Sequence, residues 1–299
     1  MIYTVTFNPA IDYVLHTDRI QTGCTNRSEY EEIFFGGKGI NVSAVLAELG
    51  VKSIALGFSA GFTGDAIEQG IKDMGVNADF VRLSNGNSRI NVKISSDEET
   101  DINGHGPQTA EQDIEKFMAK LDGVKDGDML VIGGSLPNGL TDDIYDRIFS
   151  QLSDRNIKIF ADAGQGLLEK ALKYRPFLIK PDITELCRMF GTTITTYDEA
   201  VEHAVKLQSM GAVNVLITMG EKGAVLLDET GKLHKCGVFT GTVKNTMCAG
   251  DSMLAGFIAG ISEGNFDYAL KLGTACGNAA VFSHRLAKKD LIDQLMKQL

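Results

Sequence analysis

The sequence lacks the residue spacings that bind a metal through cysteine or histidine. Its five cysteines are an odd number, lie far apart and include no C-x-x-C pair, so neither a disulfide framework nor a zinc site is indicated. The five histidines form no H-x-x-H or H-E-x-x-H pattern. We expect reduced thiols, and we expect surface or turn positions rather than ligand roles for His16, His105, His203, His234 and His284.

Long hydrophobic runs and an excess of basic residues are also missing. No segment reaches the ~18 uncharged apolar residues of a membrane span, and the first residues are typical of a short strand without a basic leader. The formal charge of -10 argues against non-specific nucleic-acid binding, which needs a basic surface. We therefore expect a cytoplasmic protein that binds neither membrane nor nucleic acid. If its ligand is anionic, the cations that hold it must be concentrated locally.

The chain has enough apolar sequence, 43% of 299 residues, to bury a large core. From about residue 129 onward, short apolar runs alternate with segments of helical periodicity. Strands are predicted at 129–134, 157–162, 177–181 and 213–219, and helices at 141–153 and 196–210, with Thr141 and Thr196 as N-caps. This alternation is typical of an α/β fold whose parallel sheet is covered on both faces. Ligands of such folds bind at the carboxyl ends of the strands.

Two early segments depart from this alternation. Residues 11–35 are more polar and have no helical period, whereas residues 89–94 alternate strictly between polar and apolar. One face of that strand would carry Ile90, Val92 and Ile94, and the other Arg89, Asn91 and Lys93. We expect segments 11–35 and 88–105 to form a small β-sheet lid, joined to the main sheet near 35–37 and 86–88. The lid would be an insertion in one domain that spans residues 1–299.

A lone carboxylate stands at the start of an apolar helical run in Cys248-Ala-Gly-Asp251. The small residues Ala249 and Gly250 let backbone N–H groups approach a ligand closely, and the helix directs its positive end to the same place. This combination predicts an anion site. Asp251 could accept a proton from a hydroxyl while the amides stabilise a transferring phosphoryl group; the alternative is that Asp251 only caps the helix.

Glycines cluster in the stretch Gly36-Gly-Lys-Gly-Ile-Asn41. The stretch is neither a Walker A loop nor the G-x-G-x-x-G fingerprint of dinucleotide-binding folds, so it supports neither reading. It is typical of a turn into a helix that holds a polar or anionic small molecule through backbone amides, Lys38 and Asn41. An ordinary strand-to-helix turn with an exposed lysine is the alternative.

Two further segments place polar groups after predicted strands. Lys180, Asp182 and Glu185 follow one strand and open a helix. The acids could hold Mg²⁺ through water while the lysine meets phosphate, or they could be exposed charges at a helix N-terminus. The stretch Thr218-Met-Gly-Glu-Lys-Gly223 sets two glycines between apolar strands, which fits a hairpin as well as a loop that contacts phosphate.

Taken together, these stretches resemble the ribokinase-like PfkB carbohydrate kinase family over essentially the whole chain. The matching motifs, in chain order, are Asn8-Pro-Ala-Ile-Asp12, Gly36-Gly-Lys-Gly-Ile-Asn41, Gly134-Ser-Leu-Pro137, Lys180-Pro-Asp-Ile-Thr-Glu185, Thr218-Met-Gly-Glu-Lys-Gly223 and Ala249-Gly-Asp-Ser252. Each motif alone is weak, but their common order is specific. The resemblance implies a three-layer α/β fold with a β-sheet lid that serves several members as a dimer interface, and ATP-dependent phosphorylation of a sugar hydroxyl.

The resemblance also implies roles for individual residues. Asp251 would be the base that activates the hydroxyl, and the amides around Ala249 and Gly250 would form the anion hole. The implied ATP ligands are Lys180, Thr218, Gly220, Glu221, Gly223 and Asn278, with Asn278 near the adenine. Mg²⁺ would be associated with Glu185 and Asp182. The implied sugar-phosphate ligands are Asp12, Arg27, Gly37, Lys38, Asn41 and Arg89.

Within the family, the branch that phosphorylates sugar phosphates is the most similar. Arg27, Lys38 and Arg89 match positions that hold a phosphate already on the substrate, for which guanidinium groups are well suited. Segments 88–94 and 99–107 resemble kinases of fructose 1-phosphate more than kinases of tagatose 6-phosphate. The expected reaction is transfer from ATP to the 6-hydroxyl of fructose 1-phosphate. Tagatose 6-phosphate is the alternative acceptor, and a non-catalytic sugar-phosphate-binding protein is a less favoured reading.

Two residues depart from the family pattern. Cys248 stands where the family has glycine, and a Cβ at this position is tolerable only if the local φ is negative, so the shape of the loop is left open. Asp182 stands where the family has asparagine and would add a negative charge beside the metal.

Overall fold

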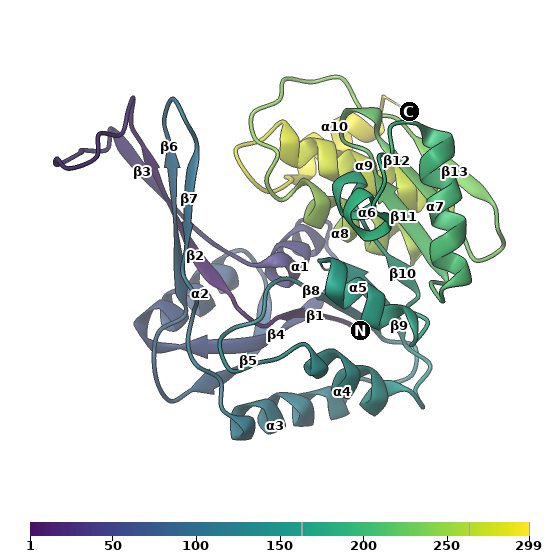
Figure 1. Ribbon diagram of the computed structural model, residues 1–299, viewed down its shortest axis with the longest axis horizontal. Coiled ribbons are helices and arrows are strands. Elements are labelled where there is room, and N and C mark those ends of the chain that lie inside the picture. The colour runs from purple at the N-terminus through teal and green to yellow at the C-terminus, as the bar shows by residue number, and fades with distance from the viewer. Residues whose placement is uncertain (163, 263, 299) are drawn as a thin grey trace.

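The larger of two β-sheets forms the centre of the molecule (Figure 1). The structure is a computed structural model that describes residues 1–162, 164–262 and 264–298. The strand order is β13-β12-β11-β10-β9-β8-β1-β4-β5, parallel from β5 to β11 and antiparallel beyond. The strands are β1 Ile2–Thr6, β4 Ser53–Ala60, β5 Asn77–Leu83, β8 Met129–Gly133, β9 Lys158–Asp162, β10 Leu178–Ile179, β11 Asn214–Thr218, β12 Ala224–Leu227 and β13 Leu233–Cys236. The predicted α/β class and its four strands are confirmed.

Helices cover both faces of this sheet because successive residues of a buried strand point to opposite sides. Along β8, Leu130 and Ile132 pack into one core and Val131 into the other. The first face carries α3 Glu111–Lys120, α4 Asp143–Leu152, α5 Gln165–Leu172, α6 Ile183–Phe190 and α7 Tyr197–Ser209. The second carries α1 Lys38–Glu48, α8 Ala249–Ile261, α9 Phe266–Val281 and α10 Lys289–Met296, and α2 Gly61–Asp73 packs in a smaller third cluster. Within the described ranges, no helix has the length and apolar character needed to span a bilayer.

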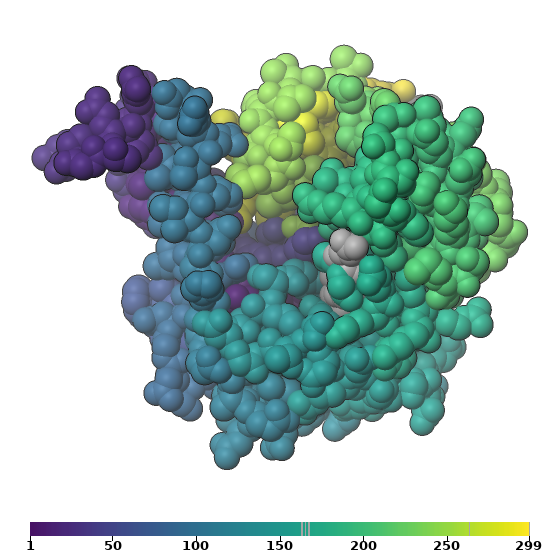
Figure 2. Space-filling model, viewed as in Figure 1, coloured from purple at the N-terminus to yellow at the C-terminus, as the bar shows by residue number. Residues whose placement is uncertain are grey.

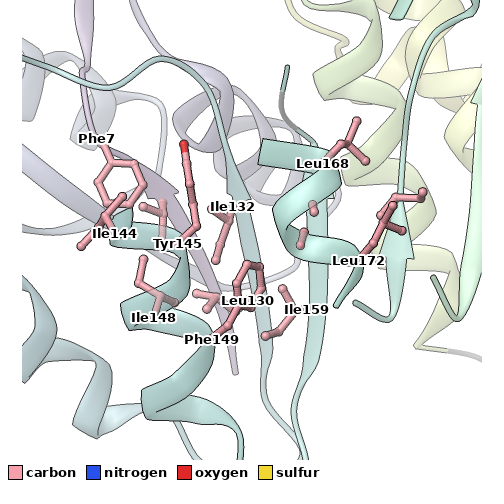
Figure 3. Packing of buried hydrophobic residues seen from close by; sticks show 14 of the residues in the cluster. Phe7, Leu130, Ile132, Ile144, Tyr145, Ile148, Phe149, Ile159, Leu168 and Leu172 are labelled. Atoms are coloured by element: carbon pink, nitrogen blue, oxygen red, sulfur yellow. The ribbon is translucent and has the colours of Figure 1, made fainter. Parts of the chain in front are cut away.

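In the first core, side chains of α4 pack against side chains of β8 and β9 (Figure 3). Phe7, which directly follows β1, points into this core. Its ring centroid lies 5.2 Å from that of Phe117 and 6.0 Å from that of Tyr145. Because Phe7 is anchored in this way, the chain that continues into the second sheet leaves the core at a fixed point.

The second sheet has four strands in the order β3-β2-β6-β7. Figure 1 shows it projecting from the main body beside α2, and its strands are β2 Ala10–His16, β3 Tyr30–Gly36, β6 Arg89–Ser95 and β7 Thr100–Asn103. This sheet is the lid predicted from segments 11–35 and 88–105. Arg89, Asn91 and Lys93 of β6 line a cavity on its inner face, whereas Ile90 is 41% exposed on the outer face.

Two predicted helix caps have different outcomes. Thr196 is the N-cap of α7: its side chain accepts from the N–H of Glu199, and the Glu199 carboxylate accepts from the N–H of Thr196. Thr141 is not a cap, because α4 begins one residue later than a Thr141 cap would require, with Asp142 at the N-cap. The Thr141 hydroxyl donates to the side chain of Asp143 instead.

Two of the five histidines are buried, contrary to our expectation of surface or turn positions. His203 on α7 is 8% exposed and His234 on β13 is 4% exposed. The ring of His234 lies between two carboxylates, with Nε2 2.8 Å from Asp228 and Nδ1 2.6 Å from Asp267. A search for histidine pairs could not detect this arrangement, because both partners of His234 are acids.

The glycine-rich loop places the first turn of α1 directly on the end of β1. Gly37 has a φ of 138°, and a Cβ at this residue would lie 2.3 Å from the side chain of Thr6. A Cβ on Gly39 would lie 2.5 Å from the carbonyl oxygen of Val5. The absence of side chains at both positions therefore lets the helix approach the strand end closely.

Gly39→Ala tests this close approach. Replacing a helical glycine by alanine ordinarily stabilises a protein by about 0.5–1 kcal/mol. Here the added Cβ would press on the Val5 carbonyl, so we expect the free energy of unfolding to fall by roughly 1–3 kcal/mol. Gly166→Ala in α5 is the matched control, because nothing lies within 4 Å of its added Cβ. Denaturant titration of both variants is the measurement, and equal stabilisation of the two would contradict this packing.

Candidate active site

A cavity of about 360 Å³ opens where the carboxyl ends of the central strands meet the lid. Figure 2 shows the hollow between the purple and blue lid and the green and yellow C-terminal part of the chain. Its walls come from β2, β6, the first turn of α1, the turn after β8 and the start of α8. Six residues proposed from the sequence line it: Asp12, Gly37, Lys38, Asn41, Arg89 and Asp251. Its position is the one expected for ligands of a parallel sheet.

Asp251 lies in the first turn of α8 and is 8% exposed. It is not the helix cap, because Cys248 occupies the N-cap position. One carboxylate oxygen of Asp251 accepts a hydrogen bond from Asn41 Nδ2 at 2.7 Å. Burial raises the pKa of Asp251 above its ordinary value, and the charge of Asp162 raises it further against the opposing effect of Lys38. A buried carboxylate with a raised pKa is well suited to take a proton from a ligand.

Asp162 pairs with two lysines beside this carboxylate. Its Oδ1 lies 3.2 Å from Lys38 Nζ and 3.2 Å from Lys180 Nζ. Burial alone would lower the pKa of Lys38, but the carboxylates of Asp162 and Asp251 outweigh it and raise that pKa, so the lysine stays charged. A Cβ built on Gly250 would lie 3.1 Å from Lys180 Nζ, which puts this cation against the start of α8.

The lid supplies a second cation to the cavity. Arg89 Nε donates to the carbonyl oxygen of Asn8 at 3.1 Å, and among the described residues no carboxylate forms an ion pair with Arg89. Burial lowers the pKa of Arg89, although the charge of Asp12 opposes this effect. A largely buried guanidinium without a paired anion is suited to bind an anionic ligand. Lys93 also lines the cavity but is paired with Asp101 at 2.7 Å.

Three asparagines near the cavity have buried side-chain oxygens without a hydrogen-bond partner among the described residues. They are Asn8, Asn41 and Asn91, all of which line the cavity. A buried acceptor without a hydrogen bond is destabilising, so such a group usually has a donor when its ligand or water is bound. Hydroxyl groups of a bound ligand would be suitable donors.

The predicted ATP-binding turn connects β11 and β12 as a hairpin. Gly220 and Gly223 have φ values of 58° and 86°, and a Cβ on Gly223 would lie 2.1 Å from the carbonyl oxygen of Cys236. The N–H of Thr218 donates to the carbonyl of Pro181, so this turn, with Glu221 at its tip, lies beside the start of α6.

Asn278 makes hydrogen bonds within the protein. Its Oδ1 accepts from the N–H of Phe239 at 2.9 Å, and its Nδ2 donates to the carbonyl of Thr274 at 3.0 Å. Asn278 thereby ties the segment after β13 to α9. Its predicted place near adenine stays a prediction.

Asp182 and Glu185 form a capping box at the start of α6. Asp182 accepts from the N–H of Glu185 at 2.7 Å, and Glu185 accepts from the N–H of Asp182 at 3.0 Å. Burial raises the pKa of Glu185, against the opposing bond from the Asp182 amide and the charge of Lys38. The two acids therefore have a structural role, which the sequence had left open, and each has a second oxygen outside the capping box.

One predicted sugar-phosphate ligand lies away from the cavity, and one charged residue beside the cavity was missed. Arg27 is exposed in the loop between β2 and β3 and is not among the residues that line the cavity. Asp162 was not singled out, although it ends a predicted buried strand, which is the position where parallel sheets place ligand-binding groups. That position was the available signal.

Phosphoryl transfer to a hydroxyl requires a base for the proton and donors that stabilise the moving charge. Asp251 and the two lysines beside it, Lys38 and Lys180, meet both requirements, so the fold and the site define a phosphotransferase of the α/β class. Residues 4–291 match the model of the pfkB family carbohydrate kinases, and the chain belongs to this family. The sequence motifs had indicated the same family, and that prediction is confirmed.

The chain is similar over its whole length to known proteins. A 1-phosphofructokinase of Bacillus subtilis (strain 168) is 39% identical over 100% of this chain and 98% of its own length. A D-tagatose-1-phosphate kinase of Bacillus licheniformis is 36% identical over 100% and 98% of the two chains. The structure of phosphofructokinase-2 from Escherichia coli in complex with fructose-6-phosphate has a TM-score of 0.92 at 25% identity, covering 100% and 98%.

Cys248 has a left-handed backbone, with φ 60° and ψ 3°. The negative φ under which a Cβ would be tolerated without strain is therefore not found at this residue. The loop keeps the conformation that glycine would adopt easily, although its residue carries a Cβ. The pKa of the Cys248 thiol is raised to about 11. Desolvation by burial is the main cause, and the negative charge of Asp251 is the second. The thiol is thus protonated at neutral pH, and the left-handed backbone is an unfavourable local conformation.

Comparing Cys248→Gly with Cys248→Ala isolates this backbone strain, because both variants lack the sulfur. Left-handed backbone costs a residue with a Cβ about 1–2 kcal/mol, partly offset by the greater freedom of glycine in the unfolded chain. We expect the glycine variant to be more stable than the alanine variant by about 1 kcal/mol in thermal or denaturant unfolding. An alanine variant that is the more stable of the two would place the backbone of residue 248 in another region.

Proposed function

We propose that this carbohydrate kinase transfers the γ-phosphoryl group of ATP to the 6-hydroxyl of fructose 1-phosphate, giving fructose 1,6-bisphosphate and ADP. The observation that carries the proposal is one cavity with a buried carboxylate on α8 and, on the lid, a partly buried guanidinium that has no ion-pair partner among the described residues. The carboxylate suits the reacting hydroxyl, and the guanidinium suits a phosphate already on the acceptor. Full-length similarity to a 1-phosphofructokinase supports the choice of sugar.

The acceptor would be held at both ends. Arg89 would bind the 1-phosphate, with Lys38 as a further cation and the Gly37 amide nearby, while Asp12 and Asn41 would accept hydrogen bonds from sugar hydroxyls. The unsatisfied oxygens of Asn8, Asn41 and Asn91 would take further hydroxyl donors. Binding of the acceptor by these side chains would account for the polar inner face of the lid.

In the proposed step, Asp251 takes the proton of the 6-hydroxyl. The hydroxyl oxygen forms a bond to the γ-phosphorus, and the bond from that phosphorus to its bridging oxygen breaks, leaving the electron pair on ADP. Negative charge on the transferring group would be stabilised by the amides around Ala249 and Gly250, the positive end of α8 and Lys180. Closure of the lid would exclude water and so limit hydrolysis of ATP.

The triphosphate would lie across the strand ends beside the hairpin. Thr218, Gly220, Glu221 and Gly223 would contact its phosphates and ribose, Lys180 would meet a phosphate, and Asn278 would lie near the adenine. The close approach of Lys180 to Gly250 supports this placement, because it puts a cation between the hairpin and Asp251, the proposed general base. We place the activity in the cytoplasm, in keeping with five free cysteines.

Mg²⁺ fits the residues on this side of the site. Among the described residues no group of three or more His, Cys, Asp and Glu side chains could hold a metal alone, but Mg²⁺ commonly uses one or two carboxylates, water and substrate phosphates. Glu185 and Asp182 have oxygens outside their capping box, and the buried Oδ2 of Asp162 has no hydrogen-bond partner among the described residues. When bound, the ion would neutralise charge on the phosphates of ATP.

Comparing acceptors tests the substrate assignment. Tagatose 1-phosphate is the second candidate acceptor, because a relative of 36% identity is a D-tagatose-1-phosphate kinase. It takes the place of tagatose 6-phosphate, the alternative acceptor named from the sequence. ADP release should be measured with fructose 1-phosphate, both tagatose phosphates, fructose 6-phosphate and free sugars. We expect the highest kcat/KM for fructose 1-phosphate. A higher value for any other acceptor overturns the assignment, and no turnover with any acceptor favours a non-catalytic binding protein.

Asp251→Asn tests the base. General-base catalysis contributes on the order of 10²–10⁴ in rate, so we expect kcat to fall by about that factor while KM for fructose 1-phosphate changes little. Asp113→Asn is the matched control, because Asp113 is also a buried acid in the first turn of a helix, α3, and pairs with Lys116. Near-normal turnover of Asp251→Asn would remove the carboxylate from the chemistry.

We propose further that two copies of the chain pair through the outer face of the lid. This face is apolar: Ile33 is 54% exposed and Ile90 41% exposed, and both line a shallow hollow with Ile11, Tyr13, Phe35 and Ala66. An exposed patch of this kind is typical of a protein interface. The phosphate role implied for Arg27 would require such an assembly, because its loop does not reach the cavity of its own chain.

Sedimentation of Ile33→Glu and Ile90→Glu tests the dimer. A charge buried at the interface would be costly, so both variants should sediment as monomers under conditions where the unmodified protein is a dimer. Val205→Glu on α7, at a residue 53% exposed, should leave the dimer intact. A monomeric unmodified protein, or dimeric lid variants, would refute pairing through this face.

A further inference from the structure

Arg285 connects the C-terminal part of the chain to the lid. It lies in the turn between α9 and α10, and its side chain is only 11% exposed. Its Nη2 donates to Asp12 Oδ2 at 2.8 Å, a contact between residues 273 positions apart. The centre of its guanidinium group lies 4.3 Å from the ring centroid of Phe34, within the range of a cation–π interaction.

These two contacts fall on one row across the lid. Asp12 of β2 is the register partner of Phe34 on β3 and of Asn91 on β6. Asn91 Nδ2 donates to Asp12 Oδ1 at 2.8 Å, so each oxygen of the Asp12 carboxylate has its own donor. One donor belongs to the lid and the other, Arg285, to the main body.

The turn that carries Arg285 is also bonded to the loop that enters α8. Asn245 Nδ2 donates to the carbonyl of His284 at 2.9 Å, and the Lys244 N–H donates to the carbonyl of Val281 at 2.9 Å. The N–H of Met247 in turn donates to Asn245 Oδ1 at 2.7 Å. The end of α9 and the turn that carries Arg285 are therefore bonded to the same segment that leads to Asp251.

The arginine also lies against the junction between lid and body. A Cβ built on Gly36, the last residue of β3, would lie 2.7 Å from Arg285 Nη2. A side chain at residue 36 would displace the guanidinium. The glycine at this position thus makes room for the contact between Arg285 and Asp12.

We propose that Arg285 is a positioning residue, which fixes the Asp12 carboxylate and the lid strands β2 and β3 relative to Asp251. Arg285 does not line the cavity, so it would act on the sugar through Asp12 rather than by contact. Without it, Asp12 would keep one donor, Asn91, and would move with the lid. The inference rests on the proposed function in one respect, namely that Asp12 binds the sugar.

Steady-state kinetics of Arg285→Ala, Arg285→Lys, Asp12→Asn and the double variant Asp12→Asn/Arg285→Ala test the proposal. Removing a donor from a buried charged group should raise KM for fructose 1-phosphate by about 10- to 100-fold in Arg285→Ala, with KM for ATP little changed. Arg285→Lys keeps the charge but not the planar guanidinium group, so its KM for fructose 1-phosphate should lie between those of the unmodified protein and Arg285→Ala. When Asp12 is already replaced by asparagine, adding Arg285→Ala should raise KM for fructose 1-phosphate by less than about threefold.

The control is Lys288→Ala, three residues further on, which removes a cation paired with Glu48 at 2.5 Å on the surface. Arg285→Ala kinetics equal to those of Lys288→Ala would overturn the proposal. An Arg285→Ala effect that is fully retained with Asp12→Asn would also overturn it, because the arginine would then act on the ligand directly. Equal rises in KM for both substrates, or a lowered melting temperature with normal kinetics, would leave Arg285 only a support for the fold.

Amide hydrogen exchange gives a readout that needs no turnover. We expect exchange in β2 and β3 to be faster in Arg285→Ala than in Lys288→Ala, with Arg285→Lys, the variant less prone to misfold, between them. Unchanged exchange in these strands would refute the tie between lid and body. If the unmodified protein phosphorylates no acceptor, the proposed function fails, while this exchange experiment still decides whether Arg285 holds the lid.

Discussion

The hydrogen bond from Asn41 to Asp251 joins two helix N-termini that are 210 residues apart in the sequence. Both α1 and α8 begin at the carboxyl ends of the central strands, so both direct backbone N–H groups and positive ends toward one cavity. The bond occupies one oxygen of the carboxylate and leaves the other for an acceptor hydroxyl. The glycines at the start of α1 matter for the same reason, because only a close approach to β1 brings Asn41 within reach.

Burying charges beside this bond is tolerable because they are paired. Asp162 is shared by Lys38 and Lys180, and a buried pair that loses one partner would be strongly destabilised. The carboxylates of Asp162 and Asp251 and the two lysines leave this cluster of charges without an excess of either sign, so the arginine on the lid supplies the additional positive charge. The cations of this protein, whose formal charge is -10, are thereby concentrated at one place, as the proposed binding of two phosphorylated substrates requires.

The layered fold could be predicted because strand and helix periodicities recur along the chain. The family motifs pointed to Asp251 and Asn41, and the resemblance to sugar-phosphate kinases pointed to Arg89; all three line one cavity. Properties that depend on tertiary packing could not be predicted from the sequence. The left-handed φ of Cys248 depends on how the loop meets α8, and the burial of His234 depends on acids from other elements. Arg285 carries no local pattern, and its role is visible only once the last turn of the chain lies beside the lid.

The dependence of kcat on pH tests the central claim, that Asp251 is the base, most directly. Because burial raises the pKa of this carboxyl, Asp251 must lose its proton at a higher pH than an ordinary aspartate, whose pKa is near 3.8. With saturating ATP and fructose 1-phosphate, we predict that kcat falls on the acid side with an apparent pKa above that value, and that the residual rate of Asp251→Asn lacks this limb. A kcat that stays constant down to pH 4, or an identical limb in both proteins, would contradict the account.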